Sequence, residues 1–208
     1  MKEMEKLKTG TTTVGILGRD FVVLAAERKA TIGYLVASKN ERKILKLDTH
    51  IAMTTAGSVG DAQALERLLK AEMRLYELED EKKMTVKEVA TLLSNILHAQ
   101  RFFPYFVQLM IAGYDTKPNL FSFDPSGSVV EETEYFSTGS GSVIAFGVLE
   151  DKYKKDLKLD DAIELAVRAI RAATQRDIAS GGSGIDVAVI DKNGFRFIEE
   201  EKIKKILK

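Results

Sequence analysis

A possible nucleophile lies close to the start of the chain, where Gly10 is followed directly by Thr11, Thr12 and Thr13. A threonine hydroxyl is a weak nucleophile at neutral pH and needs a neighbouring base. An α-amine, with a pKa of about 7.7–8.0, titrates close to the working pH and can act as that base. Cleavage of the peptide bond after Gly10 would put a hydroxyl and a free α-amine on Thr11. One cleavage would therefore create both the nucleophile and its base.

Three charged residues fall at positions where the apolar pattern predicts burial. Glu27 shares a strand face with the apolar residues of segment 21–28, and Lys43 shares a face with the leucines that follow it. Asp177 lies on the apolar stripe of a predicted helix, two helical turns after Ile170. Each charge taken singly can emerge into water at an element end. A buried Lys43 held between two carboxylates would satisfy all three, and its cation beside the nucleophile would favour a neutral amine there.

Composition excludes several other chemistries. The chain has 208 residues, enough for one domain with a continuous core, and it contains no cysteine, which excludes disulfides, thiolate metal sites and cysteine nucleophiles. Its two histidines, His50 and His98, lie far apart in the sequence, which argues against a histidine triad or a zinc site. Lysine plus arginine and aspartate plus glutamate number 31 each, so no net charge favours nucleic acid as a partner. We expect no metal and no cofactor.

Targeting signals are also missing from the sequence. Charged residues interrupt the first ten residues throughout, which is not typical of a secretory signal. No apolar stretch approaches the roughly 20 residues that a membrane helix needs. We therefore expect a cytoplasmic protein with no membrane partner.

The hydrophobic periodicity predicts strands and helices in blocks, without regular alternation. Apolar residues recur at helical spacing between 65 and 76 and between 89 and 97, and Thr85 with Glu88 has the pattern of a capping box. Further helices are predicted at 142–153, at 160–178 with Asp160 as its cap, and at the charged end of the chain. The predicted strands are 11–17, 21–28, 32–38, 43–47, 51–57, 106–114, 119–124, 129–136, 185–191 and 194–198. We expect an α+β fold in which two packed sheets are flanked by two helix pairs.

A series of short motifs keeps its order along most of the chain. The motifs are Gly10–Gly15, Ala26–Arg28, Arg42–Lys43, Ala56–Gln63, Ser137–Ser142 and Gln175–Gly182. Together they resemble the β subunits of archaeal 20S proteasomes, from Gly10 almost to the C-terminus. The resemblance implies the N-terminal-nucleophile hydrolase fold, a four-layer αββα sandwich with two antiparallel sheets between helix pairs. It also implies a threonine-type endopeptidase that needs no cofactor.

The resemblance implies roles for the residues at the nucleophile. Thr11 resembles the catalytic threonine, exposed when the precursor cleaves itself after Gly10, so that residues 1–10 form a propeptide and residues 11–208 the catalytic domain. Lys43 resembles the lysine that tunes this threonine. Glu27 resembles the carboxylate paired with the lysine, at a position where many members of the family have aspartate.

Further positions match groups that hold the amine, the oxyanion and the substrate. Ser140, Asp177 and Ser180 match the residues that hold the threonine amine and its water, and the backbone N–H of Gly57 matches an oxyanion donor. The side chain before the cut is expected in a pocket of mainly small and apolar residues, which suits chymotrypsin-like cleavage. The charge of Glu41 could admit basic side chains, or it could simply be solvated in a turn. The residues at these pocket positions are Lys29, Ala30, Glu41, Leu45, Thr55 and Val59.

The family also implies partners, and it leaves three other functions open. β subunits form heptameric rings, two of which stack between two rings of α subunits, and a regulatory ATPase delivers unfolded protein substrates. The chain could instead be a non-catalytic scaffold subunit of the same fold. It could be an amidohydrolase for small molecules, or a subunit of the bacterial two-ring ATP-dependent protease. The length of the chain and the segment Asp177–Gly182 favour the archaeal type.

Overall fold

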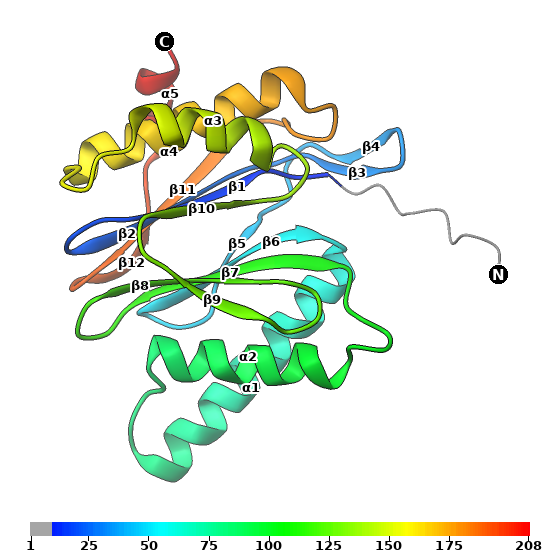
Figure 1. The fold of residues 1–208 in the computed structure, drawn as a ribbon, viewed down its shortest axis with the longest axis vertical. Helices are drawn as coiled ribbons and strands as arrows, with labels where there is room; N and C mark the ends of the chain where they lie inside the picture. Colours follow the sequence, from blue (N-terminus) through cyan, green and yellow to red (C-terminus); the bar gives the residue numbers. More distant parts are fainter. Residues whose placement is uncertain (1–9) are drawn as a thin grey trace.

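The computed structural model describes residues 10–208, so that all but the last residue of the predicted propeptide lies outside the described residues. The described chain folds into four layers, in the order helices, sheet, sheet, helices, which Figure 1 shows from top to bottom. This is the α+β sandwich that the sequence predicts. None of the described helices combines the length and the apolar character needed to cross a membrane.

The upper sheet in Figure 1 contains the strand that follows the predicted nucleophile. Its strand order is β10-β1-β2-β11-β12, and all neighbouring strands are antiparallel. The strands are β1 (Thr13–Leu17), β2 (Phe21–Glu27), β10 (Tyr135–Thr138), β11 (Ile185–Asp191) and β12 (Gly194–Phe197). Helices α3 (Ser142–Lys152) and α4 (Leu159–Arg176) cover its outer face, and α5 (Glu200–Leu207) lies against α4.

The lower sheet has the order β5-β6-β7-β8-β9 and is also antiparallel. Its strands are β5 (Ile44–Lys46), β6 (Ile51–Gly57), β7 (Val107–Tyr114), β8 (Pro118–Phe123) and β9 (Val129–Glu132). Helices α1 (Val59–Asp80) and α2 (Val86–Ala99) cover its outer face. The predicted capping box begins α2, since the Thr85 side chain accepts from the Glu88 N–H and the Glu88 side chain accepts from the Thr85 N–H.

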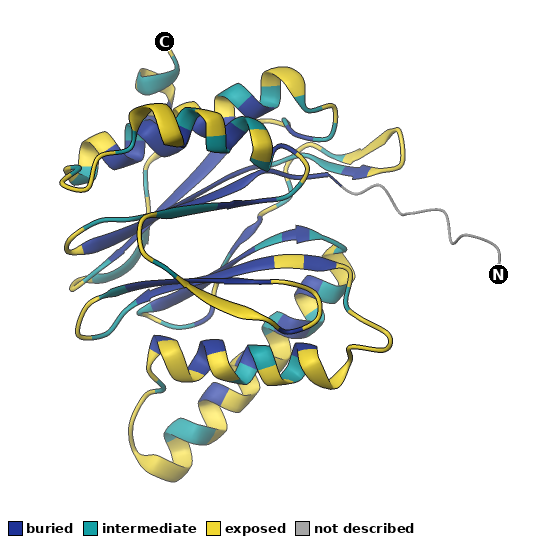
Figure 2. Cartoon of the chain, in the orientation of Figure 1, coloured by how far each residue is buried: buried dark blue, intermediate teal, exposed yellow. Residues whose placement is uncertain are grey.

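Strand β2 explains why the two sheets stack. Val23 and Ala25 face the core beneath α3 and α4, whereas Val22 and Leu24 face the second core between the sheets. A strand that is apolar on both faces must be covered on both sides, as the sequence predicts. Figure 2 shows the result, with the central strands largely buried between the two helix layers and the exposed residues of the helices on their outer faces.

Two predicted strands are each divided in the structure. The segment predicted as one strand at 32–38 instead spans the turn of a hairpin between β3 (Ala30–Ile32) and β4 (Leu35–Ser38), because Gly33 turns the chain at a φ of 59°. The segment predicted as one strand at 129–136 forms β9 in the lower sheet and then crosses to form β10 in the upper sheet. The interruption at residues 133–134 is where the chain changes sheet.

The predicted limits of α4 are also wrong at both ends. Lys158 occupies the N-cap position without a side-chain cap, and Asp160 lies within the first turn, where its charge still suits the positive end of the helix dipole. The helix ends at Arg176, and Asp177 is the C-cap residue in extended backbone. The carboxylate of Asp177 is therefore released from the helix surface and can turn towards the chain before β1.

Candidate active site

Thr11 lies just before β1 and is almost completely buried, with 4% of its surface exposed. A glycine-containing loop after β10 encloses its backbone. The Gly141 N–H donates to the Thr11 carbonyl at 3.3 Å, and a Cβ atom on Gly139 would lie 2.1 Å from the same carbonyl oxygen. Gly139 also has a φ of 92°, which other residues rarely adopt. The loop therefore needs glycine here to approach Thr11 so closely.

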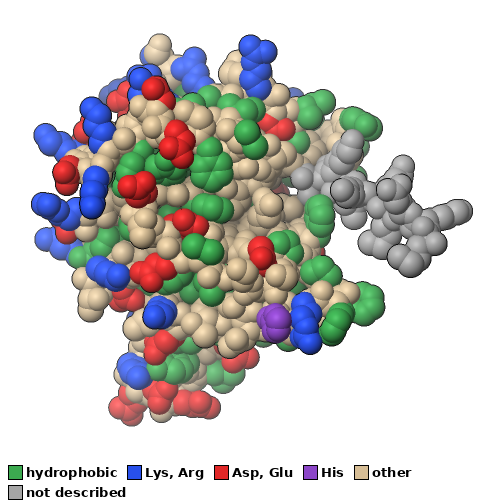
Figure 3. All heavy atoms as spheres, in the orientation of Figure 1, with side chains coloured by type: hydrophobic (Ala, Val, Ile, Leu, Met, Phe, Trp, Pro, Cys, Tyr) green, Lys and Arg blue, Asp and Glu red, His purple; other side chains and the backbone are tan. Residues whose placement is uncertain are grey.

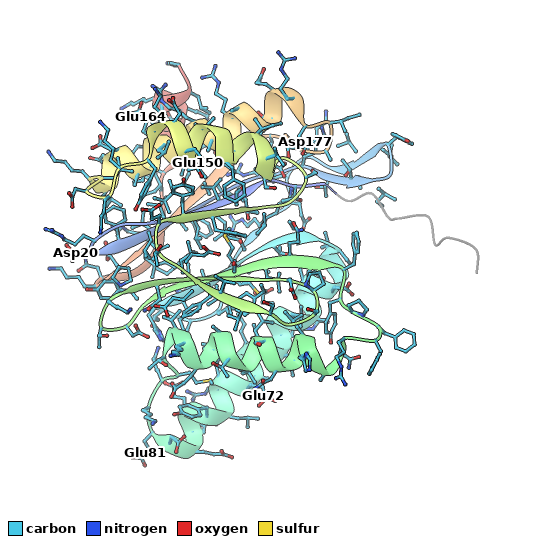
Figure 4. All side chains as sticks on the ribbon, viewed as in Figure 1. Asp20, Glu72, Glu81, Glu150, Glu164 and Asp177 are labelled. Carbon is cyan, nitrogen blue, oxygen red and sulfur yellow. The ribbon has the colours of Figure 1, made fainter. Side chains whose placement is uncertain are left out.

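A chain of hydroxyl and carboxylate groups continues from the Thr11 nitrogen. The Thr11 N–H donates to Ser140 Oγ at 3.3 Å, and Ser140 Oγ donates to Asp177 Oδ2 at 2.6 Å. The same carboxylate oxygen accepts from Ser180 Oγ at 2.5 Å, and Ser180 Oγ lies 2.6 Å from Thr12 Oγ1. Figure 4 shows Asp177 beyond the end of α4, at the end of the sandwich where the chain enters β1. The three side chains matched to the amine network thus meet beside Thr11.

Lys43 and Glu27 form a buried ion pair, as their phase with the apolar residues predicts. The side chain of Glu27 is 0% exposed and that of Lys43 is 5% exposed. Lys43 Nζ donates to Glu27 Oε1 and to the backbone carbonyl of Lys29. The second partner of Lys43 is therefore a carbonyl, which corrects the hypothesis that Asp177 supplies a second carboxylate.

The Glu27 carboxylate is held by the backbone as well as by Lys43. Its Oε2 accepts from the N–H groups of Lys29 at 2.7 Å and Gly181 at 2.9 Å, and its Oε1 accepts from the Thr12 N–H at 3.2 Å. Hydrogen bonds to an ionised carboxylate are stronger than those between neutral groups. Glu27 thereby connects three segments, and it fixes the position of Lys43 relative to the chain that carries Thr11.

Burial lowers the pKa of Lys43, because the ammonium loses its hydration shell. The charge and hydrogen bond of Glu27 oppose this shift, and the charges of Glu41 and Asp177 oppose it further. The net effect brings the lysine closer to exchanging its proton near neutral pH. Such a lysine can tune a neighbouring hydroxyl and amine.

A cavity of about 710 Å³ opens beside Thr11. Thr11, Lys43 and Gly57 line it, so the predicted nucleophile, lysine and oxyanion donor share one space. The cavity is also lined by five of the residues predicted for the substrate pocket: Ala30, Glu41, Leu45, Thr55 and Val59.

Lys29 is not among the residues that line the cavity, which corrects its predicted place in the substrate pocket. Its Nζ donates to the carbonyls of Ile178 at 2.7 Å and Ser180 at 3.3 Å. The side chain of Lys29 therefore ties the segment after α4 to the start of β3, and its backbone serves the ion pair of Lys43.

Gly57 has a conformation that other residues rarely adopt. Its φ is 122°, and a Cβ atom on it would lie 2.2 Å from the carbonyl oxygen of Phe106. This position at the end of β6 admits only glycine, which leaves the backbone free of any side chain where the cavity passes Thr11.

The bond between Gly10 and Thr11, which is predicted to be cut, lies in a tightly packed position. Thr11 Oγ1 donates to the Gly10 carbonyl oxygen at 2.6 Å, and the Gly10 N–H donates to Thr31 Oγ1 at 3.3 Å. A Cβ atom on Gly10 would lie 1.7 Å from Cβ of Ala179. Sequence reasoning missed both Thr31 and Ala179, because nothing in their own segments distinguishes them from ordinary strand and loop residues.

Comparison with known proteins now adds to this geometry. The family model described as "Proteasome subunit" matches residues 7–190. The chain belongs to this family. A proteasome subunit beta of Archaeoglobus profundus is 52% identical over 204 residues, which cover 98% of this chain and 94% of the relative. The proteasome subunit beta of Ferroglobus placidus is likewise 52% identical, over 98% of this chain and 97% of its own length. That of Archaeoglobus fulgidus is 50% identical, over 98% and 95%.

Membership of the proteasome family confirms the resemblance drawn from the motifs, and it agrees with the two antiparallel sheets between helix layers. Among the described residues, no group of three or more histidine, aspartate or glutamate side chains is arranged to hold a metal ion. The groups that meet at this site include hydroxyls, one lysine, carboxylates and backbone N–H groups.

Proposed function

We propose that the chain is a proteolytic β subunit of a 20S proteasome core, a threonine-type endopeptidase that cleaves unfolded proteins with Thr11 as nucleophile. The observation that carries the proposal is the setting of Thr11. Its hydroxyl lies 2.6 Å from the Gly10 carbonyl oxygen, and its nitrogen lies 3.3 Å from Ser140 Oγ. Membership of the proteasome family and the beta-subunit names of the relatives support the same function.

Maturation begins with the Thr11 hydroxyl. Its Oγ attacks the carbonyl carbon of Gly10, the C–N bond of the peptide breaks, and an ester joins Gly10 to the Thr11 side chain. The released nitrogen takes a proton and becomes the α-amine. Water then hydrolyses the ester, which frees residues 1–10 with a carboxylate on Gly10. The contact with Ala179 supports this step, because a larger residue at position 10 would displace the carbonyl from the hydroxyl.

Substrate hydrolysis uses the same oxygen and the new amine. The amine accepts the hydroxyl proton while Oγ attacks the substrate carbonyl, and it returns the proton to the leaving amine as the acyl-enzyme forms. The Gly57 N–H is proposed to stabilise the oxyanion, and loss of such a donor typically costs about 10²–10³ in rate. Water, held by the amine and Ser140, then releases the acyl group by the reverse sequence.

Lys43 is proposed to tune the nucleophile by charge and proton exchange. Its ammonium makes ionisation of the Thr11 hydroxyl less costly and favours the neutral form of the amine. Glu27 holds Lys43 in position, while Asp177 and Ser180 hold Ser140.

Assembly is proposed to follow the family pattern, with heptameric β rings stacked between α rings, a regulatory ATPase outside them and a cytoplasmic location. Exposed apolar side chains on the outer surface support the proposal that the chain contacts other subunits. Figure 3 shows hydrophobic side chains on the right-hand margin, where the β3–β4 hairpin and the loop after α2 project. Tyr34 and Leu35 of the hairpin are 87% and 69% exposed, and Phe102 and Phe103 of the loop are 78% and 88% exposed. Exposed apolar groups of this size are typical of protein interfaces.

The proposal is tested by replacing Thr11 in the particle assembled with its α subunits. Thr11→Ala should abolish both loss of residues 1–10 and peptide hydrolysis, because the attacking oxygen is gone. Thr11→Ser is the matched control, and it should keep both activities in part since it keeps a hydroxyl. Intact-mass measurement of the N-terminus and hydrolysis of fluorogenic peptides give the two readouts.

Each competing function has its own outcome in this experiment. A wild-type chain that still begins at Met1 after assembly would support the scaffold subunit. Hydrolysis of small amides without hydrolysis of peptides would support a small-molecule amidohydrolase. Undiminished hydrolysis by Thr11→Ala would remove Thr11 from the mechanism altogether.

A further inference from the structure

The cavity beside Thr11 has a mixed lining. Small and apolar side chains, among them Ala30, Ala37, Leu45 and Ala62, form much of the wall. Three carboxylates, those of Glu41, Asp61 and Glu66, also line it. An apolar wall alone would suit apolar substrate side chains. The acidic side chains could give the cavity a second preference, for positively charged groups.

Two of these carboxylates already have partners within the chain. Asp61 Oδ2 accepts from the Phe106 N–H at 2.9 Å, and Glu66 Oε1 pairs with Lys70 at 2.7 Å. Both partners lie on or next to α1, so these two acids stabilise the local structure and present less uncompensated charge to the cavity.

The two positively charged residues that line the cavity, Arg42 and Lys43, also contact groups other than Glu41. Lys43 is held by Glu27 and by the Lys29 carbonyl. The guanidinium of Arg42 lies over the ring of Phe197, 5.5 Å from its centroid. Neither cation makes a hydrogen bond or an ion pair with Glu41 in the described part of the chain.

Among the charged residues that line the cavity, Glu41 is therefore the one whose side chain has no hydrogen bond or ion pair within residues 10–208. It is half-buried, its backbone N–H is fixed by the Arg28 carbonyl at 2.8 Å, and its carboxylate has no hydrogen-bond or salt-bridge partner among residues 10–208. This hydrogen bond fixes the backbone of Glu41 beside the cavity that the residue lines, where a ligand can supply a counter-charge for its side chain.

We propose that Glu41 makes this pocket accept lysine and arginine side chains, so that the enzyme cleaves after basic residues in addition to apolar ones. The methylene groups of a lysine would lie along Ala30 and Leu45, and its ammonium would pair with Glu41. This inference rests on the proposed function, because it takes the cavity as the pocket for the residue before the cut.

The expected size of the effect follows from the partial burial of Glu41. A half-exposed ion pair contributes less than a buried one, and a contribution at the upper end of the surface range corresponds to about a fivefold change in kcat/KM. Salt screens such a pair, so the preference should weaken as ionic strength rises.

The test compares two peptide substrates that differ only in charge. Fluorogenic peptide amides ending in lysine or in norleucine have side chains of nearly the same length, and norleucine lacks only the ammonium. The measured quantity is the ratio of kcat/KM for lysine to kcat/KM for norleucine, in the assembled and processed particle. Glu41→Gln should lower this ratio about fivefold, and Glu41→Lys should lower it further.

Two controls separate the possible results. Glu79→Gln, an exposed change on α1 outside the cavity, should keep the wild-type ratio. A ratio that is unchanged in both Glu41 variants overturns the inference. Equal losses for both substrates also overturn it, since they would show that Glu41 acts through its charge on Lys43. Intact mass of the N-terminus shows whether each variant has folded and lost residues 1–10.

The salt dependence of the wild-type ratio tests the inference without any variant, and a ratio that is constant from low to high salt contradicts it. Failure of the proposed function has a different appearance. In that case the particle hydrolyses neither substrate, or hydrolyses both in the Thr11→Ala variant. A particle that cleaves peptides through Thr11 with no charge preference rejects the role of Glu41 alone.

Discussion

Glu27 and Arg28 are neighbours at the end of β2, and each belongs to a largely buried ion pair. The two pairs differ in whether their cation can lose its proton. The side chains of Lys43 and Glu27 are 5% and 0% exposed, and those of Arg28 and Asp186 are 19% and 9% exposed. Burial lowers the pKa of Lys43, whereas the hydrogen bond to Asp186 raises the pKa of Arg28. A buried lysine can gain or lose its proton, while an arginine keeps its charge.

The carboxylates of Glu27 and Asp186 also differ in how many of their oxygens accept hydrogen bonds. Both oxygens of Glu27 are occupied by Lys43 and backbone N–H groups. In the second pair, Nε and Nη2 of Arg28 both donate to Asp186 Oδ1, at 3.0 and 2.6 Å, and Asp186 Oδ2 has no hydrogen-bond partner in the part of the chain that is described. The first pair fixes a group that can do chemistry, and the second joins the end of β2 to β11 as a structural contact.

The largest effect is expected when Lys43 is changed to alanine. Loss of the cation should slow both removal of residues 1–10 and peptide hydrolysis by about 10³ or more, a cost of about 4 kcal/mol in the barrier. The buried Glu27 carboxylate would also lose its counter-charge. The measurement is N-terminal mass together with kcat/KM on a fluorogenic peptide.

Arg28→Lys is the matched change in the second pair. It keeps the positive charge near Asp186, and it should leave processing and hydrolysis close to the wild-type values. Normal processing by Lys43→Ala would break the distinction between the two pairs, and so would loss of processing by Arg28→Lys at a temperature where that variant is folded.

The next effect is expected on stability, from Arg28→Ala. This change leaves the Asp186 carboxylate buried without its counter-charge, which should lower the free energy of unfolding by about 3 kcal/mol. Urea unfolding of the isolated subunit, followed by circular dichroism, measures this loss. Residual activity at low temperature should persist, since the residues around Thr11 are unchanged. Arg168→Ala is the control, because the side chains of Arg168 and its partner Glu164 are 62% and 46% exposed, so loss of this pair should change the free energy of unfolding little.

The smallest effect sharpens the comparison through pH. Glu27→Gln removes a charge that raises the pKa of Lys43, so the pKa of Lys43 should fall further below its ordinary value. Lys43 would then lose its proton at a lower pH, and the alkaline limb of the kcat/KM profile should move to lower pH. Glu27→Asp keeps the charge and should keep the limb close to its wild-type position. If the alkaline limb does not move in Glu27→Gln, then Lys43 is not the group whose loss of a proton lowers kcat/KM at high pH.

Local counting places Glu27 and Lys43 in phase with apolar neighbours, but each charge taken singly would be expected to emerge into water at its strand end. Only the three in-phase charges considered together predicted that Glu27 and Lys43 are buried. The network of Thr11, Ser140 and Asp177 was not predictable in this way. Ser140 lies 129 positions from Thr11 and 37 from Asp177, and local periodicity carries no information about contacts over such separations. These residues came from the resemblance of whole motifs.

The strand predictions failed where the chain turns or changes partner. Gly33 in the segment 32–38 allows a hairpin, and alternation along a short strand does not reveal it. In the segment 129–136, β-branched residues suit either sheet, so only the three-dimensional packing decides that residues 133–134 cross between them. Lys29 also lies outside the predicted pocket. Its carbonyl accepts from Lys43, and its side chain donates to the carbonyls of Ile178 and Ser180, and local sequence patterns predict neither contact.

The crossing from β9 to β10 has a mechanical consequence. One short segment ties the edge of the lower sheet to the edge of the upper sheet, and it leads through β10 into the loop that presents Ser140 to Thr11. A force that slid one sheet along the other would therefore pull on Ser140 and stretch its link to Asp177. The same few residues therefore affect both how the two sheets are aligned and how Ser140 is placed beside Thr11.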